Sequence, residues 1–288
     1  MPEGPEVRRS ADYLSKLLVG KHIVNAFIGD GGRYTKLKPP TGFRDFVEDL
    51  SKGPCLIEAI DAKGKFMWWQ LKRGDTTWFM WVTYGMSGQW RDEQNKYTTF
   101  GINYAERGIF DEEGRYVHPK ALYFNDIRHF GTIHLVNDAQ KHAKKLASLG
   151  PDMLRNPPTE LEFQLRLSSR ALKTVAEALM DQKVVSGIGN YVKAEALYLA
   201  EISPHRLVRS LTPAERRVLR EQIINVMGAS YATGGATIST YRNADGTKGG
   251  AQRRFAVYGN QTDPMGNPVV REETKDGRTT HWVPSVQH

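Results

Sequence analysis

The chain has 288 residues, of which 40% are hydrophobic and 25% charged, as expected for a soluble globular protein with one large or two moderate cores. Its 40 Lys and Arg exceed its 32 Asp and Glu by 8, which favours a polyanionic partner. The lone Cys55 excludes an internal disulfide and a multi-cysteine zinc site. No apolar run reaches membrane-spanning length and no signal-peptide pattern is visible, so an intracellular protein is expected.

The N-terminal segment, Pro-Glu-Gly-Pro-Glu-Val-Arg, places a potential amine beside a carboxylate. A small residue at position 2 usually permits removal of Met1, which would leave Pro2 as the terminal amine next to Glu3. Because an α-amino group has a pKa near ~7.7–8.0, against ~10.4 for lysine, it is the more available nucleophile at neutral pH. An amine beside an acid suggests Schiff-base chemistry, although the same residues are also typical of an ordinary helix start with acidic residues.

A helix is predicted directly after this segment. Pro5 suits the first turn of a helix, and Gly20 supplies a stop. Apolar residues recur between them at four-residue spacing: Val7, Ala11, Leu14 and Leu18.

Residues 22–136 are expected to form mainly strands, for example 66–71 and 78–82, and several such runs predict a β-sandwich. Beyond a Pro-rich hinge the pattern becomes helical. Thr159 and Thr212 each have Glu three residues later, as in a capping box. The apolar spacing predicts further helices over 172–180, 191–199 and 218–227. We therefore expect four regions: 1–148, a hinge at 149–158, helices over 159–234, and loop and finger over 235–288.

The Ser186-Gly-Ile-Gly-Asn190 segment lies between two predicted helices. Glycines at a helix N-terminus would let backbone N–H groups approach a phosphate, and Asn190 could add a contact. Taken alone, the segment is equally a flexible turn.

In this order, the motifs resemble those of the formamidopyrimidine-DNA glycosylase/endonuclease VIII (Fpg/Nei) family of base-excision repair enzymes, across nearly the whole chain. The opening motif matches, and residues 181–190 followed by Glu195 resemble the family's helix–two-turn–helix. The resemblance implies an α+β fold. It combines a helix-capped β-sandwich domain with a mainly helical domain that carries the helix–two-turn–helix and a β-hairpin finger.

The resemblance also assigns catalytic roles. Pro2 would attack C1′ of the damaged nucleotide and form a Schiff base, while Glu3 would protonate the sugar oxygen and then transfer protons. Lys65 resembles the family lysine that contacts phosphate and assists β-elimination.

Two further segments resemble the loops that enter the DNA duplex. Met86, in Gly-Met-Ser-Gly, resembles an intercalating methionine, and Arg128 and Phe130 resemble the Arg and Phe supplied to the same task. Such wedges would hold the DNA open while the base is extruded. His129, at a position where arginine is common, is expected at a phosphate. Outside the resemblance, a Met or Phe is more often a core residue.

The C-terminus departs from the pattern of the many family members that have a four-cysteine zinc finger. The four cysteine positions are held by Thr262, Met265, Val283 and Val286. The resemblance is therefore to the zincless-finger, Nei-like branch, with no metal expected. Arg278 resembles the finger arginine that grips phosphates and promotes δ-elimination.

The combined prediction is a bifunctional DNA glycosylase and abasic-site lyase acting by β,δ-elimination. Its substrates would be oxidised pyrimidines, formamidopyrimidines and hydantoins in double-stranded DNA. No cofactor and no membrane are expected, and the protein would be a monomer located at DNA, in a nucleus, nucleoid or equivalent replication compartment. Two alternatives stay open: a catalytically silent DNA-damage binding protein of the same fold, and an Fpg-like enzyme preferring oxidised purines.

Overall fold

The computed structural model describes residues 2–30, 32–106, 118–236, 246 and 249–288. It divides into two compact units. The first unit is mainly Val7–Leu146, and the second combines Glu3–Glu6, Ala147–Thr237 and Gly249–His288. The family resemblance also implies a lesion-contacting loop before the finger, over residues 234–250, and this loop lies largely outside the described residues.

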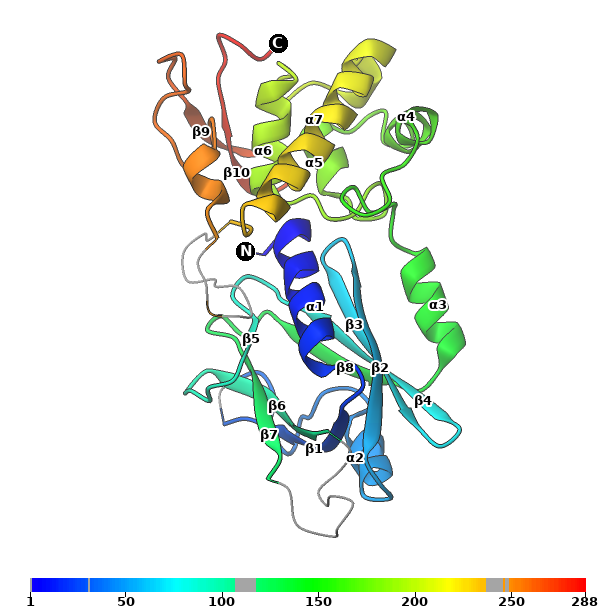
Figure 1. Cartoon of the computed structure of the whole chain (residues 1–288). Coiled ribbons are helices and arrows are strands. Elements are labelled where there is room, and N and C mark those ends of the chain that lie inside the picture. The colour runs from blue at the N-terminus through cyan, green and yellow to red at the C-terminus, as the bar shows by residue number, and fades with distance from the viewer. Residues whose placement is uncertain (1, 31, 107–117, 237–245, 247–248) are drawn as a thin grey trace. The chain divides into compact units, whose positions relative to one another are not determined.

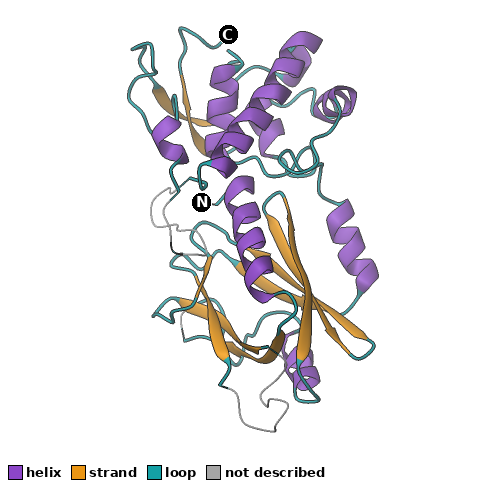
Figure 2. Cartoon of the chain, viewed as in Figure 1, coloured by secondary structure: helices purple, strands orange, loops and turns teal. Residues whose placement is uncertain are grey.

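In the first unit, the described helices and strands follow one another along the chain (Figures 1 and 2). The helices are α1 (Gly4–Leu18), α2 (Phe43–Leu50) and α3 (Ala139–Ala147). The strands are β1 (His22–Ile28), β2 (Cys55–Lys63), β3 (Phe66–Arg73), β4 (Thr76–Thr83), β5 (Gln89–Arg91), β6 (Thr98–Ala105), β7 (Lys120–Asn125) and β8 (Thr132–Val136).

These strands pair antiparallel in the order β5-β7-β6-β1-β2-β3-β4-β8. Trp69 on β3 nevertheless contacts Trp90 on β5, with ring centroids 5.1 Å apart, although four strands separate them in this order. The sheet therefore folds over on itself, which gives the predicted sandwich-like core. The apolar stripe of α1 lies in the same core, with each of its four predicted residues at most 1% exposed.

The second unit is mainly helical among its described residues. Its α-helices are α4 (Glu160–Ser168), α5 (Val175–Met180), α6 (Asn190–Leu199) and α7 (Pro213–Ala232). Short 3-10 turns are η1 (Val208–Ser210) and η2 (Ala251–Arg254), and β9 (Val270–Thr274) pairs with β10 (Arg278–Trp282). The pair α5 and α6, joined by the turns of residues 181–189, forms the predicted helix–two-turn–helix (Figure 1).

Two helix boundaries illustrate what fixes them. The Thr212 hydroxyl accepts from the Glu215 N–H while the Glu215 carboxylate accepts from the Thr212 N–H, so α7 begins with the predicted capping box. The helix predicted over 172–180 instead begins at Val175, because Thr174 and Glu177 form a second capping box that the apolar pattern did not reveal. None of the described helices is both long and apolar enough to cross a bilayer.

Candidate functional site

The Glu3 carboxylate lies at the N-terminus of α6. Its two oxygens accept hydrogen bonds from the backbone N–H groups of Tyr191 (2.9 Å) and Val192 (3.2 Å), and Glu3 is only 2% exposed. A carboxylate here also meets the positive end of the helix dipole. Pro2 immediately precedes this residue, so the predicted amine is covalently tied to a fixed acid.

Gly189 makes room for Glu3. A Cβ built on Gly189 would lie 2.1 Å from the carboxyl carbon of Glu3 and 2.4 Å from its Oε1. The N–H groups of the first turn of α6 at Tyr191 and Val192 bind Glu3. This glycine therefore admits a side chain of the protein itself.

A second buried carboxylate, Glu6, supports the first. It accepts hydrogen bonds from the Glu3 N–H (2.8 Å), the Tyr191 hydroxyl (3.0 Å), the Ser230 hydroxyl (3.3 Å) and the Ala236 N–H (2.7 Å). Burial raises the pKa of Glu6, while these hydrogen bonds oppose that shift. Glu6 therefore fixes the backbone at Glu3, a role that its place in the sequence did not reveal.

The Glu195 carboxylate on α6 binds the segment that follows η2. Its oxygens accept from the N–H groups of Ala256 (2.7 Å), Val257 (3.0 Å) and Tyr258 (2.7 Å). Asn190, at the start of the same helix, donates from its Nδ2 to the Thr279 carbonyl (2.8 Å). Glu3, Asn190 and Arg278 all lie in the second unit.

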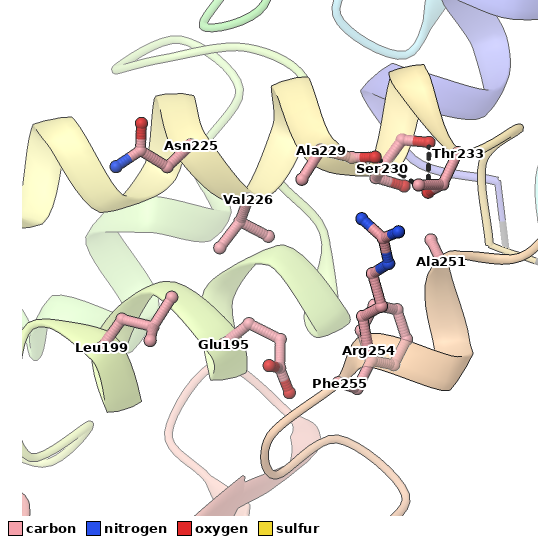
Figure 3. A pocket seen from close by; sticks show the side chains of 10 residues that line it. All are labelled: Glu195, Leu199, Asn225, Val226, Ala229, Ser230, Thr233, Ala251, Arg254 and Phe255. Carbon is pink, nitrogen blue, oxygen red and sulfur yellow. Dashed lines mark hydrogen bonds between the residues drawn. The ribbon is translucent and has the colours of Figure 1, made fainter.

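A cavity of about 210 Å³ lies beside this framework, between α6, α7 and η2 (Figure 3). Its walls are mostly apolar, and the Arg254 guanidinium points toward the C-terminal turn of α7 at Ser230 and Thr233 (Figure 3). A cation is favourable at that end of a helix dipole. The neighbouring Phe255 stacks on Tyr191, with ring centroids 5.0 Å apart. We regard the cavity as part of the packing that seats η2 and not as the reaction site.

Three of the four positions predicted to lack zinc ligands contact other parts of the second unit. Val283 is fully buried in an apolar cluster with Ala194 and Val257, against which Val286 packs. Thr262 forms an isolated antiparallel β-bridge with Pro268, and the Met265 side chain is 82% exposed.

Asp263 organises the turn between Thr262 and Pro268. Its carboxylate accepts from the N–H groups of Met265 (2.9 Å) and Asn267 (2.8 Å) and from the Tyr198 hydroxyl (3.0 Å). Within the part of the chain that the structure describes, no group of three His, Cys, Asp or Glu residues is placed to hold a metal ion.

The first unit carries a separate cluster built on the buried Asp126. Its Oδ1 accepts from the Ser87 hydroxyl (2.5 Å), and its Oδ2 accepts from the Gly131 N–H (2.6 Å). The Arg128 N–H donates to the Ser87 oxygen (2.9 Å). The Met86 turn is thereby joined to the loop of residues 126–131.

The side chains predicted to enter DNA project from this joined pair of loops. The Arg128 Nη1 lies 3.1 Å from the Met86 sulfur, and Phe130 is 57% exposed. The His129 backbone has φ 57°, and its ring lies against Gly32, where an added Cβ would be 2.1 Å from ring atom Cε1. Lys65 lies in the turn between β2 and β3 of the same unit.

Replacing Asp126 with Ala should lower the unfolding free energy of the first unit by about 3 kcal/mol, because several buried donors would lose their acceptor. Urea unfolding followed by tryptophan fluorescence measures this, since five of the six tryptophans lie in this unit. The exposed Asp138, which caps the Lys141 N–H, provides the control, and Asp138→Ala should cost about 1 kcal/mol. Equal losses in the two variants would contradict the central role of Asp126.

Three family models of formamidopyrimidine-DNA glycosylase domains match the chain. They are the N-terminal domain over residues 1–133, the H2TH domain over 149–242 and the C-terminal domain over 251–288. A formamidopyrimidine-DNA glycosylase of Thermus thermophilus is 33% identical, covering 100% of this chain and 98% of its own length. One of Listeria monocytogenes is 30% identical over the full length of both.

Solved structures of Fpg proteins are similar to this chain in fold. The MutM (Fpg) protein of Thermus thermophilus has a TM-score of 0.80 at 30% identity, covering 99% of this chain and 98% of its own. A Lactococcus lactis Fpg mutant, in complex with DNA containing Fapy-dG, has a TM-score of 0.82 at 25% identity over the full length of both chains.

Proposed function

Because the chain belongs to the formamidopyrimidine-DNA glycosylase (Fpg/MutM) family of base-excision repair, we propose that it is a bifunctional DNA glycosylase and abasic-site lyase. The observation that carries this proposal is the pairing of Pro2 with Glu3. The two N–H groups of α6 hold the carboxylate in place beside a residue that becomes a secondary amine once Met1 is removed.

The reaction begins when the Pro2 nitrogen attacks C1′ of the damaged nucleotide. The new N–C1′ bond forms as the glycosidic bond breaks, and the base leaves with the bonding electron pair. The Glu3 carboxylate takes up the proton that the Pro2 nitrogen releases and delivers it to the sugar ring oxygen as the ring opens, which leaves an iminium (Schiff base). Loss of a C2′ proton then expels the 3′ phosphate, and a second elimination expels the 5′ phosphate. Water finally hydrolyses the imine and regenerates the amine.

Extrusion of the base is assigned to the Met86, Arg128 and Phe130 side chains. Unstacking a nucleotide costs a few kcal/mol, which inserted apolar groups can offset. The Asp126 hydrogen bonds support this role, because they hold the two loops as one projecting edge. Solvent exposure of Phe130 fits a wedge better than a core residue.

Phosphate binding is assigned to Lys65, His129, Asn190 and Arg278, with Lys65 assisting β-elimination and Arg278 promoting δ-elimination. A basic protein of net charge +8 supplies the matching long-range attraction to DNA. Several neutralised phosphates imply that DNA affinity falls steeply with salt. The protein would act as a monomer at DNA.

The proposed lesions are oxidised pyrimidines, formamidopyrimidines and hydantoins. The Lactococcus relative bound to Fapy-dG DNA supports the second class. A preference for oxidised purines is the alternative, favoured by the complete set of Met86, Arg128 and Phe130. Single-turnover excision from matched duplexes that differ only in the lesion decides between them. Faster release of 8-oxoguanine than of an oxidised pyrimidine would establish the alternative.

A catalytically silent DNA-damage binding protein of the same fold is the second candidate. Binding alone gives no reason to hold a carboxylate beside the Pro2 nitrogen. Strand cleavage at an abasic site separates the two functions, because a silent protein would bind this duplex without cutting it.

We expect Arg278→Ala to weaken DNA binding and to move products from δ- toward β-elimination, because the guanidinium near the leaving phosphate would be lost. Denaturing gels of 5′- and 3′-labelled abasic duplex resolve the two products. Lys275→Ala, which removes a cation from the neighbouring turn, is the control and should leave the product ratio unchanged. An unaltered ratio in Arg278→Ala would remove Arg278 from the mechanism.

We also propose that the finger belongs to the zincless type. Its apolar cluster around Val283 and the hydrogen bonds of Asp263 take the place of metal–ligand bonds. Purified protein should therefore contain substoichiometric zinc, and treatment with EDTA should leave both the melting temperature and the cleavage rate unchanged. Stoichiometric zinc that EDTA removes, with loss of stability, would contradict this assignment.

A further inference from the structure

One buried ion pair joins the first turn of α6 to the turn of the finger hairpin. The Lys193 Nζ lies 2.6 Å from the Asp276 Oδ2, and the two side chains are 0% and 3% exposed. The residues are 83 positions apart in the chain. Asp276 lies in the tight turn between β9 and β10, two residues before Arg278.

The same helical turn binds both parts of the proposed site. The Tyr191 and Val192 N–H groups hold Glu3, the Asn190 side chain holds the Thr279 carbonyl, and Lys193 holds Asp276. Four consecutive residues of one rigid helix therefore fix the catalytic carboxylate and the two sides of the Arg278 position. This arrangement constrains the backbone at Arg278 relative to Glu3.

Hydrogen bonds inside the hairpin pass the constraint on to Arg278. The Thr274 hydroxyl donates to the Asp276 carboxylate, and its oxygen lies 3.1 Å from the Arg278 carbonyl oxygen and 2.8 Å from the Thr280 hydroxyl. The Asp276 carboxylate is thus held by Lys193 on one oxygen and by Thr274 on the other.

The free energy of the ion pair indicates that it fixes the position of the turn and contributes little to net stability. A buried ion pair contributes little net stability compared with apolar residues, yet leaving one partner alone is strongly destabilising. Burial lowers the pKa of Lys193, and the Asp276 carboxylate opposes that shift. Lys193 therefore depends on Asp276, and the hairpin turn cannot move away without leaving a buried charge unpaired.

We propose that Lys193 and Asp276 are positioning residues that hold the Arg278 turn in register with Glu3, and so determine how far the reaction proceeds from β- to δ-elimination. The inference rests on the proposed function of Arg278. Lys193, in the helix–two-turn–helix, would thus affect the elimination steps through the position of Arg278, without contacting the reacting atoms.

The test uses the full-length double variant Lys193→Met/Asp276→Asn, which removes both charges and leaves no buried ion unpaired. The control is Lys173→Met, which breaks a more exposed ion pair with Glu177 in the same unit. Hydrogen exchange of the β9–β10 turn amides is measured together with the δ-to-β product ratio on an abasic duplex. The single variant Lys193→Met should unfold at a lower temperature, because Asp276 is left buried and unpaired.

In the double variant, exchange of the turn amides should rise at least about tenfold and the δ share should fall toward that of Arg278→Ala. Release of the base should change much less, and Lys173→Met should match wild type in both readouts.

Two results would overturn the inference. Unchanged exchange would show that the ion pair does not hold the turn, whatever the chemistry. Faster exchange with an unchanged product ratio, while Arg278→Ala does shift the ratio, would show that the turn is held but does not set the reaction. If Arg278→Ala leaves the ratio unchanged, the proposed role of Arg278 fails by itself, and this inference falls with it.

Discussion

Glu3→Gln should slow base excision by about 10²- to 10⁴-fold, the range that general acid–base groups supply, while DNA affinity stays close to that of the wild type. Glutamine has nearly the same shape, but its amide cannot deliver a proton to the sugar oxygen. Its amide NH₂ would also face an N–H donor at the start of α6, where the carboxylate now accepts from both Tyr191 and Val192. Single-turnover excision and equilibrium binding to the same duplex measure the two properties.

A companion variant moves Glu3 without changing it. In Gly189→Ala the new methyl group would occupy the place of the Glu3 carboxyl group, so the carboxylate must leave α6. We expect excision to fall in this variant too, although the acid is still present. Normal excision by Glu3→Gln would exclude Glu3 as the proton donor. Normal excision by Gly189→Ala alone would show that its position on α6 is unimportant.

The second large effect concerns the amine of Pro2. A protein in which Met1 is retained should lose strand cleavage at abasic sites, because the Pro2 nitrogen becomes part of a peptide bond and can no longer form an imine. The free amine also moves by one residue, up to about 3.5 Å along the chain. The matched control is the same sequence prepared with Pro2 exposed, and mass spectrometry verifies each N-terminus. Equal cleavage by both proteins would assign the nucleophile to another group.

Local sequence patterns are sufficient to predict an element when residues within that element determine its structure. The apolar stripe of α1 and the Thr212 capping box predicted their helices, because spacing and caps act within a few residues. The same kind of signal is present in α2, where Phe43, Phe46, Val47 and Leu50 follow helical spacing. The expectation of mainly strands over residues 22–136 misses this helix, because the runs around it have strand character.

Contacts between distant parts of the chain could not be read from spacing. Nothing in the sequence near Glu6 reveals that Tyr191, Ser230 and Ala236 converge on its carboxylate. The Lys193–Asp276 pair spans 83 positions, so neither residue stood out from other charged residues. The contact between Gly189 and Glu3 is also absent from any local pattern, because only the fold brings Glu3 against Gly189.

The residues supplied by the family resemblance have different structural support. Glu3, Asn190 and Arg278 are linked through α6, and Met86, Arg128 and Phe130 are linked through Asp126. Without the resemblance, Met86 and Phe130 are of residue types that more often lie in a core. The family resemblance identifies these site residues, and the hydrogen bonds of the structure explain what holds several of them in place.

The most direct test of the account is borohydride trapping of the wild-type protein on a duplex with one oxidised pyrimidine, with an abasic duplex alongside. We expect a covalent protein–DNA adduct in which peptide mapping places the reduced imine on the Pro2 nitrogen. Absence of an adduct on both duplexes, from protein whose N-terminus is verified as Pro2, would contradict Schiff-base catalysis and favour a silent DNA-damage binding protein.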